Sequence, residues 1–349
     1  MKEIDELLSE GVRNGDFPGA SYAIVYVDKT IDSNYIGYKE LVPELQKLEG
    51  NEIYDCASLT KVVTTTTLIM KLIELQFLKL DTKVSSILPW FQHLDIEIKH
   101  LLTHSSGLPA DIQRAADLKT KEDVLFKVKQ APLIYPTGSK VIYSDIGYIL
   151  LGWVIETVTN KPLDLVAKEY IYDPLGMKDT SFSPDSERTC PTEMRVDHVY
   201  SGILRGKVHD EKSFAMNGVA GHAGMFSTVG DLSKFIFSIL KNDEKILKKE
   251  TVDSLFPPRI IDLSEGTKIR SYGWDKPSIN SSAGTLVDFD HTILHTGFTG
   301  CNLWMDTFHG IGFVMLSNAV HPKRERNRIF SYRGKIADII LSSMGVKEL

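Results

Sequence analysis

Cysteine is scarce in this chain: its 349 residues include three, Cys56, Cys190 and Cys301. They lie far apart and form neither a Cys-x-x-Cys pair nor an even set for a disulfide framework. A fold held together by disulfides is therefore not expected, and neither is a zinc site built on paired cysteines. Cys56 and Cys301 flank motifs described below, and a buried thiol is the expected state of each.

Basic clusters and long apolar runs are absent as well. The net charge is −6 and the isoelectric point is about 6.0. Because no stretch concentrates lysine and arginine, a nucleic-acid-binding surface is not expected. The longest apolar stretch, 146–154, is too short to span a bilayer. The N-terminal residues resemble an amphipathic helix and lack the apolar core of a signal peptide. We therefore predict a soluble cytoplasmic protein with no membrane span, although removal of an export signal during cloning would leave the same pattern.

Segments with the composition of strands lie near both ends of the chain. An opening helix is expected to end at Asn14-Gly15. Two strands separated by a polar turn at Asp28-Lys29 are expected to follow it. Further strand-like segments come near the C-terminus, before a last helix: 291–298, 301–307 and 310–320.

The middle of the chain is mainly helical in pattern, most clearly at 96–105, 121–131, 145–160 and 230–242. Strands at both ends that enclose helices predict an α+β fold: an antiparallel β-sheet formed by both termini and flanked by helices, with a mainly helical domain inserted. We place the sheet domain at residues 1–80 and 265–349, and the inserted domain at residues 81–264.

The stretch CASLTKVVT begins at Cys56 and leads into a segment that is expected to be helical to Leu78. Ser58 and Lys61 are three residues apart, so on a helix they would share one face, with Cβ atoms about 5–6 Å apart. A lysine beside a serine hydroxyl can accept its proton, and free N–H groups at a helix N-terminus stabilise an oxyanion. The alternative is a helix-capping serine with a lysine nearby, and the tetrapeptide by itself favours that alternative.

Two later segments carry groups that could work with this pair. In Tyr143-Ser144-Asp145, a phenol at a loop-to-helix junction could share a proton with a lysine, and the aspartate could orient both. A core tyrosine and a helix-capping aspartate are the alternatives. In the segment 295–300, glycines beside a strand allow a ligand to approach the backbone, and the strand edge offers N–H groups. A glycine-rich hairpin is the alternative there.

Together and in this order, the three segments resemble the signature of the penicillin-recognising serine hydrolases, the serine β-lactamase and penicillin-binding protein-like family. Its class A form reads Ser-x-x-Lys, Ser-Asp-Asn and Lys-Thr-Gly. The tyrosine that begins the middle motif resembles the class C β-lactamase branch, which has esterase and D,D-peptidase relatives. Stretches such as IEIKHLLTHSSGLP and GVAGHAGMFSTVGDLSKF extend the resemblance over roughly residues 10–340. The resemblance implies a β-lactamase/transpeptidase-like fold with the active site between the two domains.

By this resemblance, Ser58 is the acyl-accepting nucleophile, Lys61 its proton partner and Tyr143 the phenolic acid or base. Asp145 takes the place where the family usually has an asparagine that binds the substrate amide. The backbone N–H groups of Ser58 and Phe298 would form the oxyanion hole. The strand motif, usually begun by lysine, is taken by His295, Thr296 and Gly297.

Two departures from the family pattern bear on the substrate. An ionised Asp145 cannot donate a hydrogen bond to a substrate carbonyl. It could instead pair with Lys61 and favour the charged form of the lysine, which would move the role of base toward Tyr143; the sequence leaves open which of the two is the acylation base. His295 is expected to carry a proton only partly near neutral pH, so its attraction for a substrate carboxylate would weaken as pH rises. We therefore predict a serine hydrolase that cleaves esters, small amides or β-lactams through an acyl-enzyme on Ser58, with efficient β-lactamase activity not favoured.

Other functions stay open at this point. A D,D-carboxypeptidase of the penicillin-binding type shares the motifs, but its substrate lies outside the cytoplasm. A non-catalytic peptide-binding homologue would have no need of the complete catalytic set. His100 and His104 are four residues apart without an HExxH pattern, so no metal site is predicted. No cofactor is expected either, and the partner is a small-molecule or short-peptide substrate. The glycine-rich stretch 217–225 lacks the ending of a P-loop, and His222 is expected to line the cleft without a chemical role.

Overall fold

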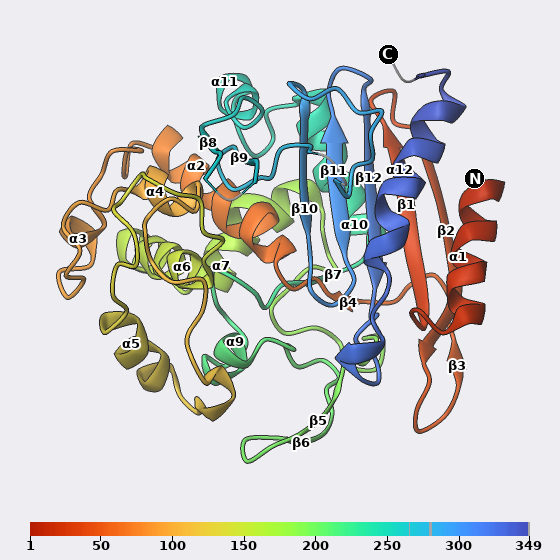
Figure 1. The fold of residues 1–349 in the computed structure, drawn as a ribbon, viewed down its shortest axis with the longest axis horizontal. Helices are drawn as coiled ribbons and strands as arrows, with labels where there is room; N and C mark the ends of the chain where they lie inside the picture. The colour runs from red at the N-terminus through yellow and green to blue at the C-terminus, as the bar shows by residue number, and fades with distance from the viewer. Residues whose placement is uncertain (265, 279–280, 348–349) are drawn as a thin grey trace.

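A computed structural model describes residues 1–264, 266–278 and 281–347. Its main feature is a six-stranded antiparallel sheet with the strand order β10-β11-β12-β1-β2-β3 (Figure 1). The strands come from both ends of the chain: β1 (Gly19–Tyr26), β2 (Ile31–Glu40), β3 (Gln46–Lys47), β10 (Thr292–Thr296), β11 (Asn302–Asp306) and β12 (Ile311–Ser317). At the centre β1 pairs with β12, so that Ala20 lies opposite Ser317. The predicted α+β fold, with an antiparallel sheet formed by both termini, is confirmed.

Helices cover both faces of this sheet. The N-terminal α1 (Lys2–Asn14) and the C-terminal α12 (Phe330–Ser343) pack together on one face, and α10 (Val229–Lys241) packs against β1 and β12 on the other (Figure 1). Because side chains alternate along a strand, Phe313 of β12 belongs to the core beneath α1 and α12, whereas Val314 belongs to the core that includes α10.

Most of the remaining helices lie beside the sheet, on the side away from the two termini (Figure 1). The predicted helices at 96–105, 121–131 and 145–160 are confirmed, with shorter bounds. The helices of this region are α2 (Thr67–Glu74), α3 (Val84–Ile87), α4 (Ile98–Leu102), η2 (Ala115–Asp117), α5 (Lys121–Lys129), α6 (Asp145–Thr159), α7 (Leu163–Ala167), η3 (Lys168–Tyr172), α8 (Asp173–Leu175) and α9 (Glu211–Ala215), with α11 (Lys249–Asp253) and η4 (Arg324–Arg326) later in the chain. None of the helices in the described ranges is both long enough and apolar enough to cross a membrane.

The division into two domains stays a prediction. The predicted boundary at residue 265 lies outside the described residues. The helix α10 falls within the residues assigned to the inserted domain, and it packs against the sheet.

Three two-stranded sheets were not predicted from the sequence. They pair β4 (Tyr54–Asp55) with β7 (Phe226–Ser227), β5 (Met194–Val196) with β6 (Ser201–Ile203), and β8 (Ile260–Asp262) with β9 (Lys268–Arg270). Strands of two or three residues are too short for an alternating pattern to show in the sequence. They matter for the site because β4 leads into Ser58 and β9 ends at Arg270.

The chain after Ser58 becomes a π-helix, η1 (Lys61–Thr66), which continues directly into α2. The threonines of this segment are buried, and their hydroxyls are bonded. Thr64 Oγ1 lies 2.7 Å from the hydroxyl of Tyr172, and Thr65 donates to the carbonyl oxygen of Gly221 at 2.6 Å. Burial therefore stabilises a helix whose residues have low intrinsic helix propensity.

Candidate active site

Ser58 lies where the chain leaves β4 and enters the helix. The preceding residue, Ala57, has a φ of 45°, a left-handed conformation that is uncommon for a residue with a Cβ atom. Asp55 holds this turn: its carboxylate accepts hydrogen bonds from the N–H groups of Ala57, at 2.9 Å, and His209, at 2.7 Å. Leu59 is the first helical residue, so Ser58 stands at the N-terminal end of the helical segment, as predicted.

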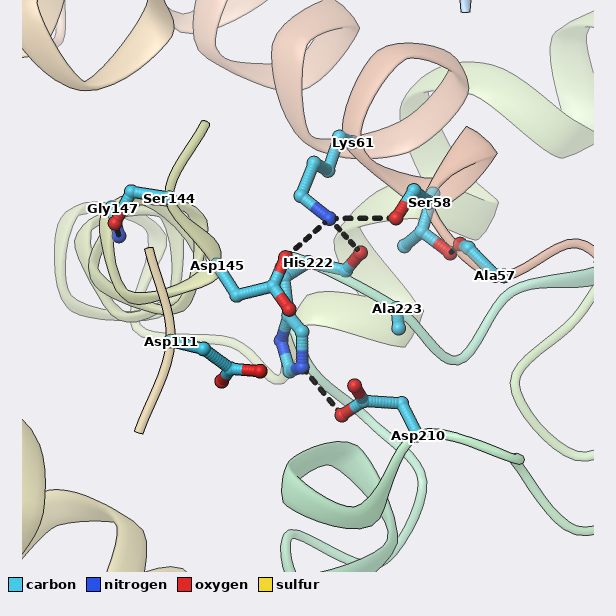
Figure 2. A network of polar contacts seen from close by, with 12 residues as sticks. Ala57, Ser58, Lys61, Asp111, Ser144, Asp145, Gly147, Asp210, His222 and Ala223 are labelled. Carbon is cyan, nitrogen blue, oxygen red and sulfur yellow. Dashed lines mark hydrogen bonds and ion pairs between the residues drawn. The ribbon is translucent and has the colours of Figure 1, made fainter. Parts of the chain in front are cut away.

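Lys61 is fully buried, and its ammonium contacts three oxygen atoms (Figure 2). Its Nζ lies 2.9 Å from Ser58 Oγ, 2.8 Å from Asp145 Oδ1 and 2.9 Å from the carbonyl oxygen of His222. Burial alone would lower the pKa of Lys61, but the Asp145 carboxylate and the phenol of Tyr143 outweigh burial, and the pKa is raised. Lys61 is therefore an ammonium group that donates a hydrogen bond to Ser58.

Tyr143 and Asp145 stand at the start of α6. Ser144 caps this helix, because its Oγ accepts a hydrogen bond from the N–H of Gly147 at 3.2 Å. Asp145 is consequently a first-turn acid that is free to face Lys61. The ring centre of Tyr143 lies 4.9 Å from Lys61 Nζ. Burial would raise the pKa of Asp145, but the charge of Lys61 and other nearby cations lowers it, so Asp145 is ionised and paired with Lys61 as the sequence predicts.

The protonation state of His295 differs from the one that the sequence predicts. The side chain is 2% exposed, and its Nδ1 lies 2.9 Å from the carbonyl oxygen of Thr296. Burial lowers the pKa of His295 well below its usual value, and the positive charge of Arg270 lowers it further. The expectation of a histidine half-protonated near neutral pH is therefore wrong, because burial and a neighbouring cation both disfavour the proton.

The positive charge near His295 belongs to Arg270, the last residue of β9. Its guanidinium lies 5.3 Å from the centre of the Tyr143 ring, and its Nε is 3.0 Å from Asp275 Oδ1. Its Nη1 is buried and has no hydrogen-bond partner among the described residues. Arg270 was not predicted from the sequence, because it stands on a three-residue strand outside the three motifs.

A second buried lysine, Lys212 at the start of α9, was also missed. Its Nζ contacts three carboxylates: Asp111 at 2.9 Å, Asp210 at 2.9 Å and Asp145 at 3.2 Å. His222 joins the same network through its Nε2, which lies 2.7 Å from Asp210 Oδ1 (Figure 2). His222 lines the cleft as expected, and in addition its ring and its carbonyl oxygen contact two charged residues, Asp210 and Lys61.

The network includes a group with the spacing of metal ligands. One atom from each of Asp145, Asp210 and His222 can be chosen so that all lie within 4.8 Å of one another. The ammonium of Lys212, however, lies 2.9 and 3.2 Å from the two carboxylates. The positive charge that a metal ion would bring is therefore already supplied by the chain.

The segment after β10 approaches the loop before Ser58 closely. A Cβ atom on Gly297 would lie 2.6 Å from the carbonyl oxygen of Cys56, so only glycine fits there. The N–H groups of Ser58 and Phe298, predicted to form the oxyanion hole, donate to no other protein group within the described residues. Cys56 and Cys301 are buried free thiols, as expected.

Phe298 exposes its ring beside this pair of N–H groups. The ring is 57% exposed, stacks on His209 with centres 5.6 Å apart, and has the guanidinium of Arg324 at 5.6 Å. Both partners bind Glu193: His209 Nε2 lies 3.0 Å from its carboxylate, and Arg324 Nη2 lies 2.6 Å from it. An aromatic surface is thus held at the edge of the site.

The predicted residues meet in one cleft of about 460 Å³, which has contributions from the loop at Ser58, from α6, α9 and β9, and from the end of β10. Its lining includes Ser58, Tyr143, Asp145, His295, Thr296 and Phe298, with Asp111, Asp210, Lys212, His222 and Arg270. Lys61 and Gly297 are buried directly behind these residues. A neighbouring cavity of about 710 Å³ shares Tyr143, Arg270, Asp275 and Thr296 with the cleft.

Comparison with known proteins places this site in a family. The sequence profile described as Beta-lactamase matches residues 4–337. A protein of Escherichia coli strain K12, provisionally named a D-alanyl-D-alanine carboxypeptidase, is 31% identical over 92% of this chain and 82% of its own length. A Bacillus subtilis strain 168 protein named N-acetylmuramyl-L-alanine amidase is 28% identical over 92% of this chain and 81% of its own length.

A solved structure shows the same fold. The octameric penicillin-binding protein homologue from Pyrococcus abyssi aligns with a TM-score of 0.78 at 22% identity, over 99% of this chain and 78% of that chain. The family profile covers nearly the whole chain, including all three motif segments. The resemblance seen in the sequence is therefore confirmed, and the chain belongs to the beta-lactamase family of serine hydrolases.

Proposed function

We propose that the protein hydrolyses carboxylic esters and small amides through an acyl-enzyme on Ser58, as a member of the class C-like branch of the family. The observation that carries this proposal is the contact of 2.9 Å between Lys61 Nζ and Ser58 Oγ in the same cleft as Tyr143. The backbone N–H groups of Ser58 and Phe298, which donate to no other protein group in the described part of the chain, support it, because they can bind the oxyanion of a tetrahedral intermediate.

The charged state of Lys61 determines the path of the proton. An ammonium group has no lone pair, so Lys61 cannot accept the proton that leaves Ser58 Oγ. We assign that proton to the oxygen of Tyr143, which has to enter this step as a phenolate, with Lys61 stabilising the negative charge that the Tyr143 and Ser58 oxygens carry in turn. Ser58 Oγ attacks the substrate carbonyl, the tetrahedral intermediate collapses, and the leaving alcohol or amine takes the proton from Tyr143. Water then repeats the sequence in place of Ser58 and releases the acid.

The walls of the cleft favour particular substrates. Asp145 accepts hydrogen bonds but does not donate them, so a substrate with an N–H group suits this position better than one with a carbonyl. Arg270 supplies a positive charge that a substrate carboxylate can pair with, in place of the neutral His295. The ring of Phe298 offers apolar contact to the acyl group.

A D,D-carboxypeptidase is the second candidate. The Escherichia coli and Bacillus subtilis relatives have names that refer to cell-wall peptides, and Arg270 could bind the terminal carboxylate of such a peptide. A panel of esters, D-Ala-D-Ala peptides and penicillins, followed by intact-protein mass spectrometry, decides between the candidates. We expect short-lived acyl adducts on Ser58 from esters. Faster turnover of the peptides than of the esters would favour the carboxypeptidase, and no adduct from any compound would refute acyl transfer.

A further inference from the structure

Lys212 and Lys61 bind the same carboxylate from its two sides. Asp145 Oδ1 lies 2.8 Å from Lys61 Nζ, and Asp145 Oδ2 lies 3.2 Å from Lys212 Nζ. The other two contacts of Lys212, each 2.9 Å long, are to Asp111 and Asp210. The carboxylate that faces the nucleophile's lysine is thus shared with a second lysine.

His222 connects Asp210 with Lys61 and so completes the network. The ring of His222 binds Asp210 at 2.7 Å, and its carbonyl oxygen accepts a hydrogen bond from Lys61 at 2.9 Å. Asp210 also caps α9, because its Oδ1 accepts a hydrogen bond from the N–H of Ser213 at 2.8 Å. This cap places Lys212 in the first turn of the helix, with its side chain directed at Asp145.

The side chain of Lys212 is buried, and the carboxylates around it keep it charged. Its side chain is 2% exposed, and the free-energy cost of removing an ammonium group from water is offset here by the carboxylates that surround it. Burial alone would lower the pKa of Lys212, but Asp210, Asp145 and Asp111 outweigh burial and raise it. Lys212 therefore carries a full positive charge that these three aspartates face.

We propose that Lys212 is the positioning residue for Asp145: it holds Oδ2 and balances part of the carboxylate charge, so that Lys61 keeps its contact with Ser58. This inference rests on the proposed acyl transfer at Ser58. An asparagine, which the family pattern has at this position, has no charge for a second lysine to balance. Lys212 is required because residue 145 is an aspartate.

Removal of the ammonium has a defined consequence. Asp145 would direct its whole charge at Lys61, draw it away from Ser58 and weaken the positive potential at Ser58 and Tyr143. Loss of a proton from the coupled side chains of Ser58, Lys61 and Tyr143 would become less favourable. Acylation would slow, and the acid limb of its pH profile would move to higher pH.

A double-mutant cycle tests this coupling. The rate constant of the p-nitrophenol burst from p-nitrophenyl acetate is measured for Lys212→Gln in the native and the Asp145→Asn backgrounds. In the native background we expect a loss of about tenfold and an acid limb shifted upward by about one pH unit. In the Asp145→Asn background we expect a change below about threefold. Lys212→Arg, which keeps the charge, should recover most of the loss.

Lys234 provides a matched control. It contacts Asp231 at 2.7 Å on α10 and lies outside the cleft, so Lys234→Gln should keep the native rate constant. Equal losses from Lys212→Gln in both backgrounds would overturn the inference, because Lys212 would then serve the fold rather than Asp145. No loss in the native background would overturn it as well.

Two further measurements keep the inference separate from folding and from the proposed function. If Lys212→Gln alone does not fold, the double variant should fold, and its failure to do so would refute the role. A crystal structure of Lys212→Gln without substrate should show Lys61 displaced from Ser58, and an unchanged contact would overturn the inference whatever the activity. Absence of an acyl adduct on Ser58 of the native protein with every compound of the panel would instead refute acyl transfer at Ser58.

Discussion

The ammonium nitrogen of Lys61 lies 2.8 Å from Oδ1 of Asp145, with both side chains largely buried. This ion pair keeps the lysine protonated, so Lys61 acts on Ser58 as a hydrogen-bond donor. An asparagine in place of Asp145 would hold the lysine by a weaker, neutral contact. The pair is therefore the reason for proposing Tyr143, and not Lys61, as the group that accepts the proton of Ser58.

Replacing Ser58 by alanine should abolish the p-nitrophenol burst, because its Oγ, which Lys61 contacts at 2.9 Å, is the proposed nucleophile. The burst is measured by stopped-flow absorbance with p-nitrophenyl acetate. The melting temperature should stay close to that of the native protein, since the Ser58 side chain fills no core position. A burst of undiminished amplitude in Ser58→Ala would falsify the assignment of the nucleophile.

Tyr143→Phe should lower the burst rate constant by about 10²–10⁴, the range that general acid–base groups contribute. The amplitude should stay equal to the enzyme concentration, because Ser58 is still present. Tyr172→Phe is a suitable control: its hydroxyl bonds Thr64 in the helix that follows Ser58, outside the cleft. If both variants lose the same factor, the phenol of Tyr143 has no specific part in proton transfer.

Asp145→Asn should accelerate acylation by penicillins, because the amide can donate a hydrogen bond to the substrate carbonyl whereas the carboxylate cannot. A fluorescent penicillin and gel quantification give the labelling rate of the two forms. Equal labelling rates would show that Asp145 is not what limits recognition of the β-lactam amide.

Arg270→Gln should raise KM for an ester that carries a carboxylate, with little effect on a neutral ester of similar size. His295 should make no contribution that depends on pH: a histidine whose pKa is lowered well below its usual value is neutral above that pKa, and so stays neutral from pH 6 to 8. The KM of the anionic ester should consequently be constant over this range. A rise in KM between pH 6 and 8 that disappears in His295→Asn would restore the histidine as the titrating group.

The family, the main sheet and the candidate nucleophile of this protein can be predicted from its sequence. The order Ser58-x-x-Lys61, Tyr143 and the segment at His295 indicates the family, the sheet built by both termini and the predicted nucleophile. This is possible because a helix N-terminus, a loop-to-helix junction and a strand edge are local structures with local sequence signals. The pairing of Asp145 with Lys61 was also expected, since opposite charges in one site attract.

Only the tertiary structure shows the charges around those residues. Lys212 reaches Asp145 from a five-residue helix, and Arg270 reaches Tyr143 from a three-residue strand, and neither has a motif of its own. The neutral state of His295 depends on burial and on Arg270, which lies on a different strand. The local sequence at Ser58, Tyr143 and His295 thus indicates which groups are expected to react, whereas long-range packing decides their charge, because burial and neighbouring ions are properties of the folded chain.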